Sequence, residues 1–333
     1  MLTNAFHNYL QSVTAKGVLC AVSIDGVVQT FSGGSITNEE HDTPFYIYSI
    51  SKTFTAVATL LLCEQHGNFL DHSVQELLPH YEIPNEVTVR QLLNHTSGLS
   101  DYFMQKDYQD AVHNHPTKPW SYEKLMQVGL RKTPLFPAGE TFSYSNPGYG
   151  MLKEIIELKS GLTFYDYIDR VIIKPLGLTE TKPFTKLDLD HELLAGSDPE
   201  MDGDFRELYH PDWIATGCVI STVTEITQFY QALFSGNLVT QTSLSEMTEL
   251  IELKFPLPTP RIAAYGLGLM SAINDPSGVN FGHGGGGPGY TTYARHYPDY
   301  DGKQITIALV VNASLDRTPF ELADEIFIKI TKD

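Results

Sequence analysis

Strand-like segments lie at both ends of this 333-residue chain, and the long part between them has a helical pattern. At the start, apolar residues in 17–24 and 27–32 flank Asp25-Gly26, which predicts a hairpin. Near the end, strands are predicted over 264–270, 279–281, 291–297 and 306–311, followed by a helix over about 319–331. Because these strands do not alternate with helices, a doubly wound parallel sheet is disfavoured.

The simplest architecture is therefore α+β: one antiparallel sheet built from both ends of the chain and flanked by helices, with a mostly helical subdomain inserted into it. We predict one domain over 1–333, with a sheet part from 1–65 and 213–333 and a helical part from 66–212. A short helix over 1–16 and a strand over 216–221 complete the pattern. A helix over 223–234 and a shorter one over 244–250 follow.

The net charge of −18, from 40 acidic and 22 basic residues, repels phosphate backbones and makes nucleic acid an unlikely partner. Three widely spaced cysteines suit no disulfide framework. The sequence contains no apolar run of the roughly 18 residues that a transmembrane helix needs. Its first residues also lack a signal-peptide pattern. We expect a cytoplasmic protein, or an envelope or secreted protein whose leader is absent from this sequence; the oligomeric state stays open.

The apolar segment Phe45–Asn68 contains the first candidate for chemistry, Ser49-x-x-Lys52. Its helical spacing predicts a buried helix that ends near Gly67, so Lys52 lies one turn from Ser49 on the same face. A lysine in such a segment needs a partner or a purpose, and a serine beside it can be a nucleophile beside a base. Ser121-x-x-Lys124 has the same spacing but fits a solvated helix start, with Ser121 as the N-cap.

Two further stretches have the residue types that a serine nucleophile needs. Tyr144-Ser145-Asn146 lies in a constrained loop before a helix, although the triplet also fits an ordinary turn. His283 opens the glycine run of 284–287, where missing side chains let a ligand approach the backbone, unless the run is only a flexible loop. The GxGxxG within that run precedes a strand pattern instead of a helix, which excludes a dinucleotide fingerprint.

Other constellations fail on spacing. His113-Asn-His115 has no third metal ligand at a useful distance, and His191-Glu192 lacks the second histidine of HExxH. Ser235-Gly-Asn237 follows a predicted helix and fits its C-terminal cap. No GxSxG elbow supports an α/β-hydrolase. We therefore expect no metal and no organic cofactor.

Taken together and in this order, Ser49-x-x-Lys52, Tyr144-x-Asn146 and His283-x-Gly285 resemble the motifs of the serine β-lactamase and penicillin-binding-protein superfamily. The Y-x-N triplet is similar to that of the branch with class C β-lactamases, DD-carboxypeptidases, D-aminopeptidases and esterases. Stretches at 92–99, 136–140, 175–178 and 265–268 also resemble this branch. The resemblance covers about residues 15–330 and implies the β-lactamase/transpeptidase-like fold.

The resemblance also implies a role for each site residue. Ser49 would be the acylated nucleophile, and Lys52 and Tyr144 would share the role of general base, with positive charge from Lys52 and His283 favouring the phenolate of Tyr144. Asn146 would bind the acyl-side amide of a small-molecule or peptide substrate. The Gly285-Gly286 backbone would bind substrate, with the N–H groups of Ser49 and Gly286 forming an oxyanion hole.

Two departures from the family pattern bear on the substrate. His283 replaces a lysine, as in the peptidase and aminopeptidase members, and Gly284 replaces a hydroxyl residue that helps bind the substrate carboxylate. Arg295, on the next strand, is a candidate to bind a carboxylate instead, although the pattern favours an exposed sheet arginine. We predict a serine acyl hydrolase acting on D-amino-acid peptide amides, β-lactams or small esters.

Several alternatives remain open from the sequence. A D-aminopeptidase or an esterase without β-lactam activity fits the same motifs, and Gly284 favours these two. A protein of another class, a non-catalytic binding protein on the same fold, is disfavoured by the intact set of Ser49, Lys52, Tyr144 and His283. A metal-dependent hydrolase is the weakest alternative.

Overall fold

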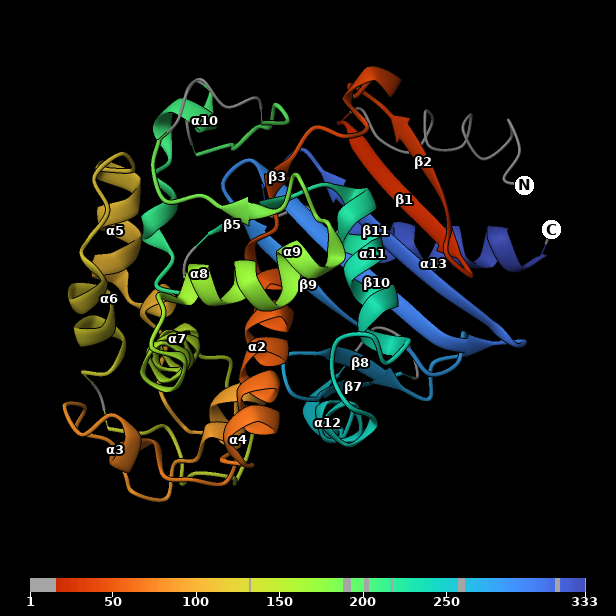
Figure 1. The fold of residues 1–333 in the computed structure, drawn as a ribbon. Coiled ribbons are helices and arrows are strands. Elements are labelled where there is room, and N and C mark those ends of the chain that lie inside the picture. Colours follow the sequence, from red (N-terminus) through yellow and green to blue (C-terminus); the bar gives the residue numbers. More distant parts are fainter. Residues whose placement is uncertain are drawn as a thin grey trace.

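The computed structural model describes residues 16–131, 133–187, 193–200, 204–216, 218–256, 261–314 and 318–332. Within these ranges, a large antiparallel sheet occupies one side of the molecule and helices from the middle of the chain gather on the other (Figure 1). The helix predicted for the first residues lies almost entirely outside the described part of the chain.

The main sheet has eight strands in the described residues, in the order β2-β1-β11-β10-β9-β8-β7-β6. Val18 is paired with Gly33 on one side and with Val311 on the other, so strands from both ends of the chain lie side by side. This confirms the predicted α+β fold with an antiparallel sheet. The strands are β1 (Val18–Ile24), β2 (Val27–Gly33), β6 (Ile251–Pro256), β7 (Ile262–Tyr265), β8 (Met270–Ile273), β9 (Phe281–Gly287), β10 (Tyr290–Tyr300) and β11 (Lys303–Val311).

Two long helices cover the two faces of this sheet. Helix α11 (Val223–Phe234) packs on β1, β10 and β11, and α13 (Thr318–Lys332) packs on β10 and β11 from the opposite face (Figure 1). Tyr297 of β10 stacks on Phe327 of α13, with ring centroids 4.0 Å apart. Both faces of the sheet are therefore buried. The strands do not alternate between polar and apolar residues, so the sequence does not show which side chains point to which face.

The remaining helices belong mainly to the middle of the chain, as predicted. They are α2 (Ser51–His66), α3 (Val74–Leu77), α4 (Val89–Leu93), α5 (Lys106–Asn114), α6 (Tyr122–Gly129), α7 (Asn146–Ser160), α8 (Phe164–Ile168), α9 (Lys174–Leu176), α10 (Phe205–Leu208) and α12 (Gln241–Met247). A π-helical segment over Asp169–Ile173 connects α8 to α9. Three-residue 3₁₀ turns are η1 (Asn38–Glu40), η2 (Tyr48–Ile50), η3 (Tyr102–Met104) and η5 (Pro211–Trp213).

A second sheet of three short strands joins the two parts of the molecule. Strand β5 (Val219–Ser221) lies between β3 (Phe45–Tyr46) and β4 (Lys182–Pro183). Phe45 pairs with Ser221 and Tyr46 with Ile220. These pairings fix the chain immediately before η2, and hence the start of α2.

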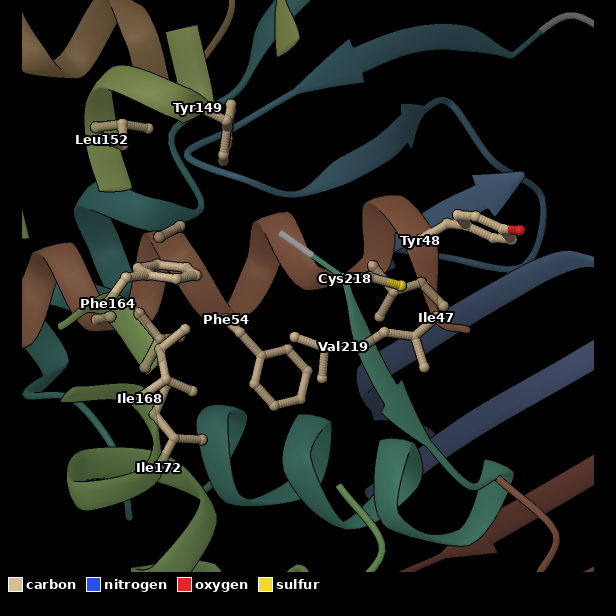
Figure 2. Packing of buried hydrophobic residues seen from close by; sticks show 14 of the residues in the cluster. Ile47, Tyr48, Phe54, Tyr149, Leu152, Phe164, Ile168, Ile172, Cys218 and Val219 are labelled. Carbon is tan, nitrogen blue, oxygen red and sulfur yellow. The ribbon is translucent and has the colours of Figure 1, made fainter. Parts of the chain in front are cut away.

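Helix α2 runs through the centre of the molecule and is buried on nearly all sides. Phe54 stacks on Phe229 of α11 with ring centroids 3.8 Å apart, and side chains of α7 and α8 pack on another side (Figure 2). The buried hydroxyl of Thr53 donates to the Gly268 carbonyl at 2.8 Å. The helix ends at Gly67 as predicted, and this packing holds its first turn rigidly in place.

Several elements differ from the sequence-based expectation. The segment predicted as one strand over 264–270 is a hairpin of β7 and β8, with Gly268 at φ +68° in its turn. The glycine run belongs to strand β9 and is not a flexible loop. Helix α5 and strand β6 had no predicted counterpart. In the part of the chain that is described, no helix has the length and apolarity to cross a membrane.

Candidate active site

Ser49 lies at the centre of η2, directly before α2. The preceding residue, Tyr48, has a left-handed backbone with φ +47°, which is uncommon for a non-glycine residue. Its ring lies against β9, because a Cβ added to Gly287 would come within 2.5 Å of it, and its hydroxyl donates to the Pro288 carbonyl. The tight turn is therefore fixed from both sides.

Lys52 is 1% exposed, and its ammonium lies at the point where three of the predicted residues meet. Its Nζ is 3.2 Å from Ser49 Oγ and 2.8 Å from Asn146 Oδ1, and it lies 4.9 Å from the centre of the Tyr144 ring. Burial lowers the pKa of Lys52 to about 7, against the opposing effect of the Asp101 carboxylate. A substantial fraction of Lys52 is therefore a free amine at neutral pH.

Tyr144 precedes α7, whose N-terminus is capped by Ser145 through a 3.2 Å bond to the Gly148 N–H. The Ser49 side chain is a neighbour of the Tyr144 hydroxyl and lowers its pKa. Burial raises the pKa of Tyr144 far above its usual value, and the effect of Ser49 offsets only part of this. The expected phenolate is therefore not the resting form, and Tyr144 is a neutral phenol beside the serine.

His283 is fully buried in β9, and its ring centroid lies 6.4 Å from that of Tyr144. Its Nδ1 donates to the Gly284 carbonyl at 2.6 Å, so Nε2 accepts from the Tyr265 hydroxyl at 2.8 Å. Burial, opposed by the hydrogen bond to the Gly284 carbonyl and assisted by the charge of Lys52, lowers the pKa of His283 to about 3. The expected positive charge on His283 is therefore wrong; a neutral imidazole supports the wall behind Tyr144.

Strand β9 brings its glycine backbone alongside the serine. A Cβ added to Gly285 would lie 3.1 Å from Ser49 N and 2.5 Å from the Ile47 carbonyl, so only glycine fits there. Gly286 has open space at the same point and lines a cavity with Ser49. In the described residues, β8 pairs with β9 only at Phe281 and Gly282, which leaves the outer backbone edge of the glycine run unpaired by strands.

Arg295 is the predicted site residue that the structure places elsewhere. It lies on β10 opposite Gly282, but its side chain points to the α13 face of the sheet, where it pairs with Asp324 and with the hydroxyls of Tyr293 and Tyr297. The sheet separates it from Ser49. The proposed carboxylate-binding role of Arg295 is therefore corrected to a structural one.

A hydroxyl side chain at position 284 would point to the same far face. A Cβ added to Gly284 would lie 2.9 Å from Phe320 of α13, which occupies this position. A hydroxyl residue there would have to displace the Phe320 ring before it could reach a substrate.

Sequence reasoning missed two residues that contact the site. Asp101 accepts from Asn146 Nδ2 at 3.0 Å and from the Phe103 N–H at 3.0 Å, and thereby fixes which end of the amide faces Lys52. His95 packs against Tyr144 with ring centroids 4.2 Å apart. Asp101 had a detectable signal, because Asp is a preferred N-cap residue and it caps η3; His95 showed none beyond its family-like stretch.

Two adjoining cavities open beside Ser49. The inner one, of about 60 Å³, is lined by Ser49, Lys52, Asn146 and Gly286 together with aromatic side chains. The outer one, of about 160 Å³, shares Phe103, Tyr108, Tyr209, Gly287 and Pro288 with it and is lined by Asp198 and Glu200. Among the described residues, no group of three or more His, Cys, Asp or Glu side chains is placed to hold a metal ion.

Comparison with known proteins agrees with this geometry. The chain is 29% identical to penicillin-binding protein 4* of Bacillus subtilis over 271 residues, which is 77% of this chain and 58% of that protein. It is 27% identical to a D-aminopeptidase of Cereibacter sphaeroides, covering 82% of this chain and 51% of that protein. The chain thus spans little more than half the length of these relatives.

Among solved structures, a D-stereospecific amidohydrolase from Streptomyces sp. aligns with a TM-score of 0.83 and 28% identity over 94% of this chain and 95% of that chain. A D-amino acid amidase from Ochrobactrum anthropi aligns with a TM-score of 0.84 and 25% identity over 99% and 98%. The family model described as Beta-lactamase matches residues 2–328. The chain belongs to the Beta-lactamase family, and it has the β-lactamase/transpeptidase-like fold.

Proposed function

We propose that the chain is a serine acyl hydrolase that forms an acyl-enzyme at Ser49 and prefers amides or esters of D-amino acids to β-lactams. The observation that carries this proposal is the 3.2 Å contact between Ser49 Oγ and a Lys52 amine whose pKa is about 7. A nucleophile beside a base that is partly unprotonated at neutral pH is the arrangement that acyl transfer needs.

In the acylation step, the Lys52 amine accepts the Ser49 proton while Oγ attacks the substrate carbonyl carbon. The negative charge on the carbonyl oxygen is stabilised by the N–H groups of Ser49 and Gly286. When the carbon–nitrogen or carbon–oxygen bond breaks, the leaving group takes a proton from the Tyr144 phenol, which Lys52 then reprotonates. Asn146, bonded to Lys52 and Asp101, retains a second amide hydrogen for the acyl-side carbonyl.

In the second step, water attacks the ester carbonyl of the acyl-enzyme. Its proton passes to the Lys52 amine, the carbon–Oγ bond breaks, and Ser49 regains a proton as the carboxylic acid leaves. The neutral His283 takes no proton in either step, because its low pKa keeps it unprotonated. Its bond to Tyr265 instead supports the side of the cavity behind Tyr144.

The charges around the two cavities support a substrate without a free carboxylate. Among the described residues that line them, Lys52 is the only lysine or arginine, and Arg295 lies behind the sheet. Asp198 and Glu200 make the outer cavity acidic, which favours a neutral or cationic group there. Similarity to a D-stereospecific amidohydrolase supports the D-configuration of the acyl residue.

The test is mass spectrometry and turnover with four acyl donors: D-phenylalanine amide, L-phenylalanine amide, p-nitrophenyl acetate and benzylpenicillin. We expect ester turnover, faster hydrolysis of the D-amide than of the L-amide, and little penicillin adduct, all lost in Ser49→Ala. A stable penicillin-sized adduct on the wild type would place the chain with penicillin-binding proteins instead. The absence of turnover and adduct with all four would favour a non-catalytic binding protein.

A further inference from the structure

His95 is a buried histidine that the proposed reaction does not use. It follows α4 in the stretch before Ser97, with φ +59°, a left-handed backbone that His and Asn tolerate better than most residues. The side chain is 0% exposed, and it makes no hydrogen bond to Ser49 or Lys52. Its carbonyl, its Nδ1 and its ring contact the three successive residues 143–145.

The contacts of His95 hold Tyr144 from both sides along the chain. The Ser143 N–H donates to the His95 carbonyl at 2.9 Å, and the Ser145 N–H donates to His95 Nδ1 at 3.1 Å. Between these two bonds, the His95 ring lies 4.2 Å from the Tyr144 ring at an interplanar angle of 35°. One residue thus fixes the backbone before Tyr144, the backbone after it, and the ring itself.

The protonation state of His95 follows from the same contacts. Because Nδ1 accepts a hydrogen bond, the ring hydrogen is on Nε2, which has no hydrogen-bond partner in the structure. Burial lowers the pKa of His95 well below its usual value, and the charge of Lys52 lowers it further. A second proton would remove the Nδ1 acceptor and place a cation beside Lys52, so the ring is neutral.

We propose that His95 is a positioning residue that keeps the Tyr144 phenol beside Ser49 and Lys52. The proposal rests on the proposed function, since Tyr144 acts there as the proton donor. The rings of Tyr149 and Tyr265, with centroids 5.1 and 5.0 Å away, fix His95 in turn. His95 is therefore held by the packed core and in turn holds the Tyr144 hydroxyl, which donates the proton to the leaving group.

The test compares His95→Asn with His95→Gly and with a matched control, His296→Asn. Asn tolerates the left-handed backbone, and its Oδ1 can replace Nδ1 as the acceptor for Ser145, so this variant loses mainly the ring. His296 is an equally buried histidine, bonded to Thr306 Oγ1 at 2.8 Å and stacked on Phe234, but it lies away from the cavities. It reports what the loss of a buried imidazole does on its own.

We expect kcat for p-nitrophenyl acetate to fall about 10- to 100-fold in His95→Asn, with KM changed less than about twofold, and further in His95→Gly, because small misplacements of a reacting group are costly. His296→Asn should keep kcat. The acidic limb of the pH profile should keep its midpoint, because His95 itself exchanges no proton. A shift of the acidic limb of the pH profile would show that His95 itself exchanges a proton, which contradicts a positioning role. An unchanged kcat in a folded His95→Asn would also overturn the proposal.

Crystal structures of the wild type and His95→Asn separate this inference from the proposed function. The inference requires the Tyr144 phenol of the variant to leave Ser49 or to occupy several positions. A wild type without any hydrolase activity would overturn the proposed function only. An unmoved Tyr144 in the variant would overturn the positioning role, whatever the activity.

Discussion

A lysine amine in water is almost fully protonated at neutral pH, and the burial of Lys52 changes this by lowering its pKa from 10.5 to about 7. Below about pH 7 the protonated amine cannot accept the Ser49 proton, so kcat/KM should fall about tenfold per pH unit. Above pH 7 the rate should level off. Steady-state kinetics of an ester between pH 5 and 9 would show this, and a limb centred near pH 10 would contradict the role of Lys52.

The Asp101 carboxylate raises the pKa of Lys52, so its neutralisation should lower that pKa further. In Asp101→Asn, we expect the acidic limb to move to lower pH. The maximum rate should also fall about tenfold or more, because an amide at 101 can turn its NH₂ towards Asn146 Nδ2 and release it. The measurement is again the pH profile of kcat/KM.

Asp71→Asn serves as the control for this experiment. Asp71 is exposed and pairs with Arg90 on the surface, so the midpoint of the limb should not move. An unshifted limb in Asp101→Asn would show that its carboxylate does not act on the lysine.

Two serines share the S-x-x-K spacing, and they should respond in opposite ways to substitution. Ser49→Ala should abolish turnover. Ser121→Ala should leave kcat unchanged and lower the free energy of unfolding by about 1 kcal/mol, because Ser121 Oγ accepts from the Lys124 N–H at the start of α6. Turnover and urea unfolding of both variants check this. A large loss of activity in Ser121→Ala would mean that the wrong serine was chosen.

The order of the three motifs and their resemblance to a known family were sufficient to find the residues that surround the Lys52 ammonium: Ser49, Tyr144 and Asn146. They were not sufficient for Arg295, since the face to which a strand residue points depends on register and both faces of this sheet are buried. The charge state of His283 also could not be read, because it follows from complete burial. His95 acts through contacts that only the fold creates.

At the scale of elements, strand β9 and turn η2 approach each other so closely that two neighbouring glycines should behave differently. Gly285→Ala would place Cβ 2.5 Å from the Ile47 carbonyl and 3.1 Å from Ser49 N, so β9 or η2 must shift. We expect lower stability, by about 1–3 kcal/mol as for other overpacked sites, and a kcat reduced about 100-fold or more.

Gly286→Ala is the matched control, because its Cβ would meet nothing within 4 Å. It should fold normally, because its methyl group meets nothing, and its kcat should fall much less than that of Gly285→Ala. Thermal unfolding and steady-state kinetics of both variants test the pair. Equal stability of the two would show that β9 is more loosely packed on η2 than the structure indicates.

Elements with a clear hydrophobic period were predictable from sequence, and α11 matches its predicted bounds at both ends. The glycine run was not predictable as a strand, since glycine is depleted in strands and β9 is specified by its pairing with β10. Helix α5 is largely polar, and its apolar stripe consists only of Tyr108, Ala111 and Val112, which is too little to have indicated the helix.

At the scale of the whole molecule, the buried Arg295 links the sheet to α13. It pairs with Asp324, which also accepts from Arg261 at 2.5 Å. We expect Arg295→Met to lower the free energy of unfolding by about 3 kcal/mol, because it leaves Asp324 without one of its partners. KM should be unchanged for substrates with and without a carboxylate. If KM rose only for substrates with a carboxylate, Arg295 would bind the substrate after all.

The overall architecture followed from the order of strand and helix patterns along the chain, without any contact being known. The division into a sheet part (1–65 and 213–333) and a helical part (66–212) stays a prediction. In the three-stranded sheet, β5 lies within the strand predicted over 216–221, but β3 and β4 could not have been foreseen, because each has only two residues. Strands this short have no readable period.

The pairing of β1 with β11 has a consequence for synthesis. Val18 of β1 is opposite Val311 of β11. During synthesis, β1 therefore cannot pair with β11 until almost 300 further residues have been translated. At ~5–20 residues per second, that delay is roughly 15–60 seconds. The nascent chain exposes an apolar hairpin with one open edge throughout this time. A ribosome that stalls before the last strands therefore releases a chain prone to aggregation, and chaperones that shield such edges should raise its yield.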